Sequence, residues 1–128
     1  MMAKENNTLH LVLKRKWWDM MASGEKMEEY REVCHYWAAR LLDSRYSWYS
    51  RNTDYPHDYV GWLCLKLAQK SIAFKNYENV CFHLGYTNTT MTYRVEDICI
   101  IHGSACNKEW GAEESKHYFV IKLGERIE

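Results

Sequence analysis

Leucines alternate with other residues near the start of the chain, and this spacing predicts a β-strand. Leu9, Leu11 and Leu13 are each two positions apart, so on a strand their side chains point to one face, which we expect to be buried. Three apolar residues then recur at helical spacing, namely Trp17, Met20 and Met21. The chain is therefore predicted to begin with a strand that leads into a short helix.

Apolar residues three and four positions apart predict two more helices before the middle of the chain. The first, at about 34–43, carries Trp37 and Leu41 on one face, which is the pattern of an amphipathic helix. The second, at about 58–69, has Leu63 on its apolar face.

The segment between these helices, residues 44–57, holds turn-forming residues, the only proline and no periodic pattern. It is predicted to be a mobile loop. Its alternating aromatic and arginine side chains suit a lid that stacks on a base or follows a nucleic-acid backbone. A surface loop held down by its own rings would have the same composition, because loops of this length serve either purpose. Both interpretations stay open.

The second half of the chain changes to a period of two. Alternation of apolar with other side chains predicts strands in three stretches, at residues 80–84, 91–95 and 119–123. Residues 85–90 suit a hairpin connection, and 103–115 a longer loop that carries Trp110. These elements predict an α+β fold in which a mixed β-barrel has helices packed outside. A length of 128 residues is that of one domain.

Charged residues at fixed spacing follow the first predicted helix, in the pattern G-x-K-x-x-E-x-R formed by Gly24, Lys26, Glu29 and Arg31. Gly24 stands where a helix ends in a left-handed residue, a conformation that glycine adopts without steric cost. On a regular strand Glu29 and Arg31 share one face, and Lys26 lies on the other. The three converge only if Lys26 is in the turn and folds back. A surface ion pair, worth at most about 1 kcal/mol, is the structural alternative.

This pattern, placed after a strand and a helix, resembles the signature of the ASCH domain, a small β-barrel module related to the PUA domain. The resemblance covers nearly the whole chain in outline, and its specific part is residues 24–31. It implies one PUA-like domain over 1–128, a mixed β-barrel with helices packed outside. Residues 34–70 would then be a helical and loop insertion.

The resemblance also implies a cleft that accepts RNA, a nucleotide, a nucleoside or a modified base. Lys26 and Arg31 would hold a phosphate or a base oxygen, and the Glu29 carboxylate would accept a hydrogen bond from an exocyclic amine or a ring N–H. Three rings close to the motif could stack on the base, namely Tyr30, Trp17 and Trp18. Packing of the two tryptophans in the core is the simpler interpretation of the same residues.

Some ASCH members resemble amidohydrolases that remove an acyl group from a modified cytidine, using the motif lysine and a threonine three residues later. Glu29 stands at the threonine position here, so the nucleophile of that mechanism is missing. A hydrolase of N-acylated nucleosides such as N4-acetylcytidine would instead use Lys26 and Glu29 to handle the proton. Those enzymes also use a later acidic residue, for which the candidates are Glu78, Glu96 and Glu109.

Composition limits the remaining function classes. Basic and acidic residues number 17 each, so any attraction to nucleic acid has to be local rather than a property of the whole chain. The five cysteines include no C-x-x-C pair, which suits reduced thiols in the cytoplasm.

Neither a metal nor a cofactor is expected from the sequence. Cys99, His102 and Cys106 match no common zinc unit, and the chain lacks a glycine-rich phosphate loop. No apolar run reaches the roughly 18 residues of a membrane span. We therefore expect a binding module for RNA, a nucleotide or a modified base, of undetermined oligomeric state. The small hydrolase and a non-catalytic protein-interaction domain are the alternatives.

Overall fold

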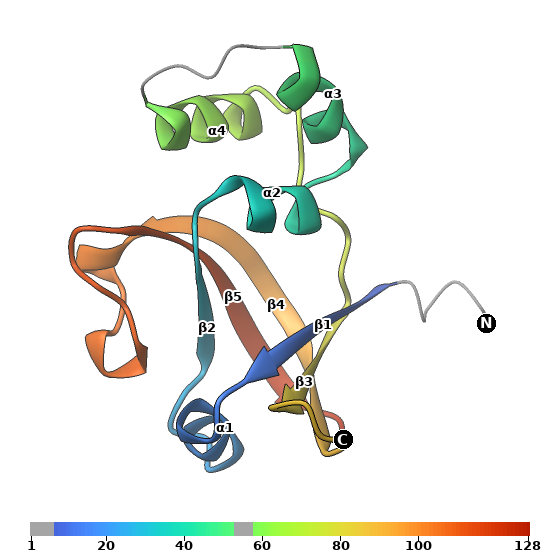
Figure 1. The fold of residues 1–128 in the computed structure, drawn as a ribbon, viewed down its shortest axis with the longest axis vertical. Helices are drawn as coiled ribbons and strands as arrows, with labels where there is room; N and C mark the ends of the chain where they lie inside the picture. Colours follow the sequence, from blue (N-terminus) through green and yellow to red (C-terminus); the bar gives the residue numbers. More distant parts are fainter. Residues whose placement is uncertain (1–6, 53–57) are drawn as a thin grey trace.

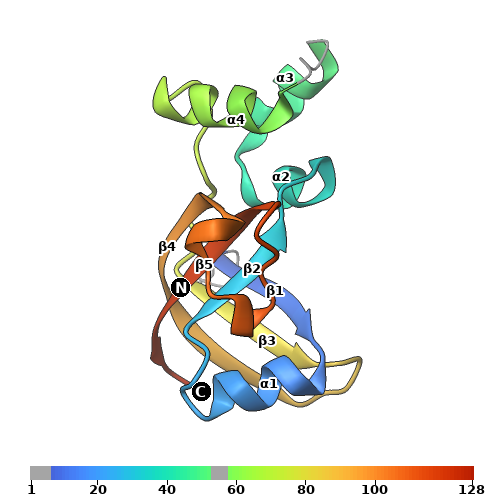
Figure 2. The ribbon, with the colours of Figure 1, turned by 90° about the vertical axis from the view of Figure 1, so that its left-hand side faces the viewer.

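The computed structural model describes residues 7–52 and 58–128, which form a mixed five-stranded sheet and a set of helices. The sheet has the order β1-β3-β4-β5-β2 and curls into a half-barrel (Figures 1 and 2). Its strands are β1 (Thr8–Leu13), β2 (Glu28–Glu32), β3 (Asn79–Leu84), β4 (Thr90–His102) and β5 (His117–Arg126). Strands β1 and β3 are parallel, and the other neighbours are antiparallel. The predicted α+β class and mixed sheet are confirmed.

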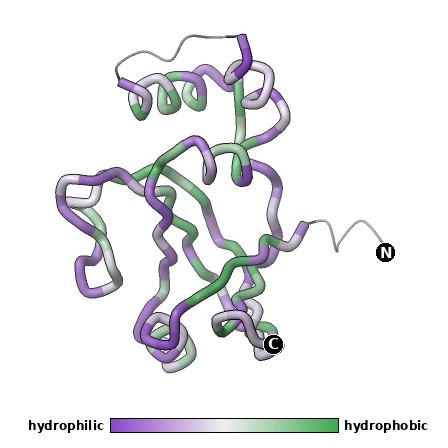
Figure 3. Tube along the Cα trace, viewed as in Figure 1, coloured by the Kyte–Doolittle hydropathy of each residue, from purple (hydrophilic) through white to green (hydrophobic). Residues whose placement is uncertain are grey.

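Alternating leucines of β1 enter the core, as their spacing predicted. Leu9, Leu11 and Leu13 are buried, while His10 and Val12 face outward. The hydropathy colouring shows β1 as a mainly hydrophobic stretch that crosses the sheet (Figure 3). The helix α1 (Arg15–Ala22) follows at one end of the half-barrel (Figure 1). The other predicted strands are also present, and β4 extends well beyond the predicted 91–95.

Gly24 ends α1 in the predicted way. Its φ is 84°, in the left-handed region that a residue with a side chain adopts only at a steric cost. Its N–H donates to the Met21 carbonyl at 3.1 Å, and the Lys26 N–H donates to the Met20 carbonyl at 3.0 Å. The chain is thus turned back toward the helix before β2 begins at Glu28.

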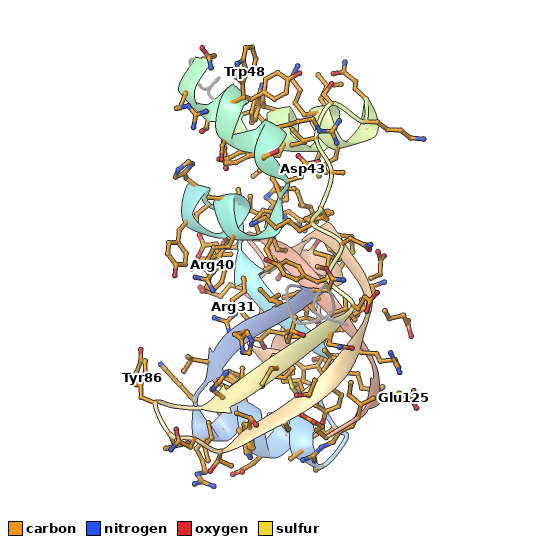
Figure 4. The ribbon with its side chains drawn as sticks, turned by 90° about the vertical axis from the view of Figure 1, so that its right-hand side faces the viewer. Arg31, Arg40, Asp43, Trp48, Tyr86 and Glu125 are labelled. Atoms are coloured by element: carbon orange, nitrogen blue, oxygen red, sulfur yellow. The ribbon has the colours of Figure 1, made fainter. Side chains whose placement is uncertain are left out.

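Three helices stand together beyond one end of the sheet (Figures 1 and 4). They are α2 (His35–Leu41), α3 (Ser44–Asn52) and α4 (Tyr59–Ala68). The structure confirms the helices predicted at 34–43 and 58–69. No helix among the described residues is long and apolar enough to cross a membrane.

The prediction of a mobile loop was wrong for residues 44–52, which form α3. Tyr46 is the buried residue of this helix. Its hydroxyl lies 2.8 Å from His35 Nδ1 and 2.6 Å from the Tyr59 hydroxyl. The helix is held through the hydroxyl of one buried ring, which bonds to residues of both neighbouring helices. Such contacts leave no periodic apolar pattern from which a helix could be predicted. Residues 53–57 of the predicted loop lie outside the described residues.

Asp58 begins α4 as its N-cap, because its carboxylate accepts a hydrogen bond from the Gly61 N–H at 2.8 Å. Loss of an N-cap acceptor costs about 1 kcal/mol. We therefore expect Asp58→Ala to lower the free energy of unfolding by about 1 kcal/mol in urea denaturation. Asp58→Asn keeps an acceptor and should cost much less. Equal losses in both variants would contradict the capping role.

Candidate functional site

The motif lysine and glutamate form a buried ion pair. Lys26 lies in the turn before β2, and its Nζ is 2.5 Å from Glu29 Oε1 and 2.6 Å from the Glu28 carbonyl oxygen. The side chains of Lys26 and Glu29 are only 1% and 7% exposed. A regular strand would have kept the two apart. The turn at Gly24 allows the amine to fold back over the start of β2, as the motif geometry required.

Arg31 completes the cluster from the other side of Glu29. Its Nε and Nη2 donate to Glu29 Oε2 at 3.0 and 2.6 Å. Nη2 also donates to the Val12 carbonyl at 3.0 Å, which ties β2 to β1, the two opposite edges of the sheet order. The guanidinium lies 4.8 Å from the ring centre of Trp37, a cation–π contact. Figure 4 shows Arg31 beside β1, with Arg40 of α2 above it.

The cluster keeps some hydrogen-bonding capacity. A carboxylate offers about four acceptor positions, and Glu29 uses one on Oε1 and two on Oε2 for its cations. One position on Oε1 is left. Arg31 Nη1 makes no hydrogen bond with any described residue, so its two N–H groups are available. The site therefore offers one acceptor position on Glu29 and the two N–H groups of Arg31 Nη1.

Two neighbouring clefts open onto Glu29. One has a volume of about 260 Å³ and the other about 100 Å³. They share three lining residues, Trp17, Glu29 and Tyr30. The larger cleft runs along the seam between β1 and β2 and is also lined by Val12, Leu13, Lys14, Arg31 and Glu32. Both are below the roughly 300 Å³ at which ordinary small-molecule pockets begin, so they suit a single ring system rather than a large cofactor.

Aromatic rings wall the smaller cleft. Trp110, Gly111 and Tyr118 line it together with the shared residues, and the Tyr30 and Tyr118 ring centres are 5.7 Å apart. Gly111 has a φ of 103°, and a Cβ there would lie 3.2 Å from the Trp17 ring. Glycine thus lets the connection between β4 and β5 pass close to Trp17. Flat walls of this kind are typical of sites that hold planar ligands.

Tyr30 anchors that connection to β2. Its hydroxyl donates to Glu28 Oε1 at 2.7 Å and accepts from the Asn107 N–H at 3.0 Å. Burial and the neighbouring Glu28 carboxylate raise the pKa of Tyr30 well above its usual value. The phenol therefore stays protonated at every physiological pH and serves as a fixed donor.

Some predicted site residues do not reach the clefts. Lys26 lines neither cleft and lies behind Glu29. Trp18 is buried in the hydrophobic core, so core packing is the correct interpretation for this ring, whereas Trp17 lines both clefts. None of the three later acidic candidates lines either cleft, namely Glu78, Glu96 and Glu109.

Three aromatic rings that line the smaller cleft or contact Arg31 were not singled out from the sequence as site residues. They are Trp37, Trp110 and Tyr118. Trp110 stands in the predicted loop 103–115, where an aromatic residue between glycines was the only signal. Trp37 and Tyr118 lie in periodic apolar patterns, which indicate a core position equally well.

The chain matches no protein-family model, no curated protein and no solved structure.

Proposed function

We propose that the clefts at Glu29 bind a nucleobase, presented by a nucleoside, a nucleotide or an unpaired base of RNA, and that the chain is an ASCH-like binding module. The observation that carries this proposal is the buried Glu29 carboxylate. It is held by two cations at the base of an aromatic-walled cleft, and it keeps one acceptor position. A carboxylate fixed in this way recognises an N–H donor on a flat ring.

The hydrogen-bonding pattern of the cluster favours a base over other planar ligands. Glu29 Oε1 can accept from an exocyclic amine or a ring N–H, and Arg31 Nη1 can donate to a base oxygen or a phosphate oxygen of the same ligand. Bases carry both N–H donors and oxygen acceptors on their edges. Trp17 and Tyr30 supply surfaces for stacking.

Cations near the mouth of the larger cleft support a phosphate-bearing ligand. Lys14 lines this cleft, and Lys16 Nζ lies 4.7 Å from the ring centre of Trp17. A phosphate next to the bound base would be close to both ammonium groups. Because this charge is local, binding should depend on salt only through a small number of phosphate contacts.

Lys26 acts in this proposal by positioning Glu29 rather than by touching the ligand. Nζ donates to two protein acceptors, Glu29 Oε1 and the Glu28 carbonyl. The same arrangement weakens the hydrolase alternative. A general base has to accept a proton from water, and Lys26 and Arg31 already occupy three of the four acceptor positions of Glu29.

The test is a titration followed by tryptophan fluorescence, using nucleosides, nucleoside monophosphates and short single-stranded RNA. We expect Glu29→Gln to weaken binding by at least about tenfold, since a hydrogen bond to a charged group contributes about 1.5–3 kcal/mol. Trp110→Ala, which leaves the ion cluster in place, should weaken binding by about 1–3 kcal/mol if the ring stacks on a base.

The matched control is Glu125→Gln, since Glu125 forms an exposed ion pair with Arg94 at 3.1 Å. It should bind as the unchanged protein does. If none of these ligands binds at millimolar concentration, or if Glu29→Gln and Trp110→Ala bind normally, the proposal fails. Release of cytidine from N4-acetylcytidine, lost in Glu29→Gln, would instead support the hydrolase.

A further inference from the structure

A second cluster of reactive side chains lies on the outer face of the sheet, where β1 and β3 run in parallel. The residues of β1 and β3 that enter the core leave His10, Cys81 and His83 on the opposite face. His10 is the register partner of Cys81, and His83 lies one outward position further along β3. Two imidazoles and a thiol thus meet outside the core.

These groups are close enough to share one ion. His10 Nδ1 lies 3.0 Å from His83 Nε2, and Cys81 Sγ lies 3.8 Å from the same nitrogen. All three ligand atoms lie within 4.8 Å of one another. A tetrahedral zinc site with Zn–N of about 2.0–2.1 Å and Zn–S of about 2.3 Å sets N···N at about 3.3 Å and N···S at about 3.6 Å. Shifts of a few tenths of an ångström would bring the two pairs that include His83 to those separations, and the remaining pair, Cys81 with His10, starts from no more than 4.8 Å.

The surroundings supply room and a further polar group. A cleft of about 530 Å³ is lined by His10 and Cys81, together with Asn79, Thr92 and Glu128 among others. Asn79 Oδ1 is buried and has no hydrogen-bond partner among the described residues. Asn79 lies two positions before Cys81 on β3 and so shares its outward face. A buried amide oxygen with no partner is costly, and this one belongs to a residue that lines the same cleft as His10 and Cys81.

We infer that His10, Cys81 and His83 bind a transition-metal ion of the zinc class. Imidazole and thiolate ligands favour Zn²⁺ or Cu⁺ over Mg²⁺ or Ca²⁺, which take oxygen ligands. Three protein ligands leave a fourth position for water or for the Glu128 carboxylate at the same cleft. Binding releases the thiol proton of Cys81 to solvent, because the ligand is the thiolate.

The test uses the full chain, stripped with a chelator, and titrated with Co²⁺ and with Zn²⁺. A single cobalt ion should produce a thiolate-to-metal charge-transfer band in the near ultraviolet, and one equivalent of zinc should abolish it. Cys81→Ser should remove the band, and His83→Ala should weaken zinc binding by more than about 100-fold, since even the loss of an outer partner costs roughly 10–100-fold.

Two variants serve as controls because they remove the same chemical groups elsewhere. Cys34 and His102 are exposed, so Cys34→Ser and His102→Ala should retain the band and the zinc affinity. Circular dichroism establishes that each variant is folded. Failure of the unchanged protein to bind either ion at one equivalent would overturn the inference. So would unchanged zinc affinity in folded Cys81→Ser and His83→Ala.

Discussion

Replacing Lys26 by methionine is expected to lower the free energy of unfolding by about 3–5 kcal/mol, the usual cost of removing one partner from a buried ion pair. Methionine fills a similar volume but leaves the Glu29 carboxylate buried with only Arg31 beside it. The Lys26 side chain is 1% exposed, so water cannot replace the lost amine without opening the turn. Urea denaturation measures the change directly.

A matched exposed pair controls for the loss of one positive charge. Lys108 Nζ lies 3.3 Å from Glu114 Oε2, and both side chains are more than half exposed. Lys108→Met should therefore cost no more than about 1 kcal/mol. The double variant Lys26→Met with Glu29→Gln should recover part of the lost stability, because it also removes the buried charge. A cost below about 1 kcal/mol for Lys26→Met would contradict the burial argument.

The second large effect is expected from Gly103→Ala. A Cβ at Gly103 would lie 1.9 Å from the Glu113 carbonyl oxygen and 2.9 Å from that of Lys116. Both are backbone atoms, so a side-chain rotation cannot relieve the overlap. We expect a loss of about 1–3 kcal/mol or more in unfolding free energy, and faster amide exchange across residues 103–116.

This substitution should also weaken ligand binding, because the displaced segment carries Trp110 and the Asn107 N–H that Tyr30 accepts. Gly124→Ala is the control, since its Cβ would lie 3.4 Å from Arg94 Cβ, close to an ordinary contact. It should fold and bind normally. Normal stability and exchange in Gly103→Ala would show that the segment adapts without strain.

Loss of stability in Lys26→Met does not by itself distinguish a binding site from a purely structural ion cluster. The protein-interaction alternative treats the cluster as part of the scaffold, and it too predicts destabilisation. Trp110→Ala separates the two, because Trp110 takes no part in the hydrogen bonds of Lys26 and Glu29 and, of the two clefts, lines only the smaller. A nucleoside titration of that variant therefore decides between them.

Local patterns predicted much of the secondary structure. The alternation of Leu9, Leu11 and Leu13 identified β1, and Gly24 identified the end of α1, because in both cases the determining contacts lie within a few residues. The α3 helix was missed since Tyr46 bonds to residues of two other helices. Such contacts are set by the tertiary structure and leave no period in the sequence.

The candidate site was predicted only in its local part. Lys26, Glu29 and Arg31 lie within six positions, so their convergence followed from one turn. Trp110 and Tyr118 reach the cleft through the pairing of β5 with β2. The cluster of His10, Cys81 and His83 could not be predicted for the same reason, since His10 and His83 are 73 positions apart. From the sequence, the residues weighed as metal ligands were Cys99, His102 and Cys106. Among the described residues, these three do not form a group that could hold a metal ion.

The hydrogen bond from Arg31 Nη2 to the Val12 carbonyl affects the rigidity of the sheet. Strands β1 and β2 are the two edges of the sheet and are not paired with each other. The Arg31 guanidinium therefore links the two edges across the open side of the half-barrel. A base that accepts a hydrogen bond from Nη1 would restrict the movement of the guanidinium and so stabilise its bond to the Val12 carbonyl. Ligand binding in the cleft would then make the curved sheet more rigid. Amide exchange in β1 would become slower, although only Val12 and Leu13 of this strand line the larger cleft.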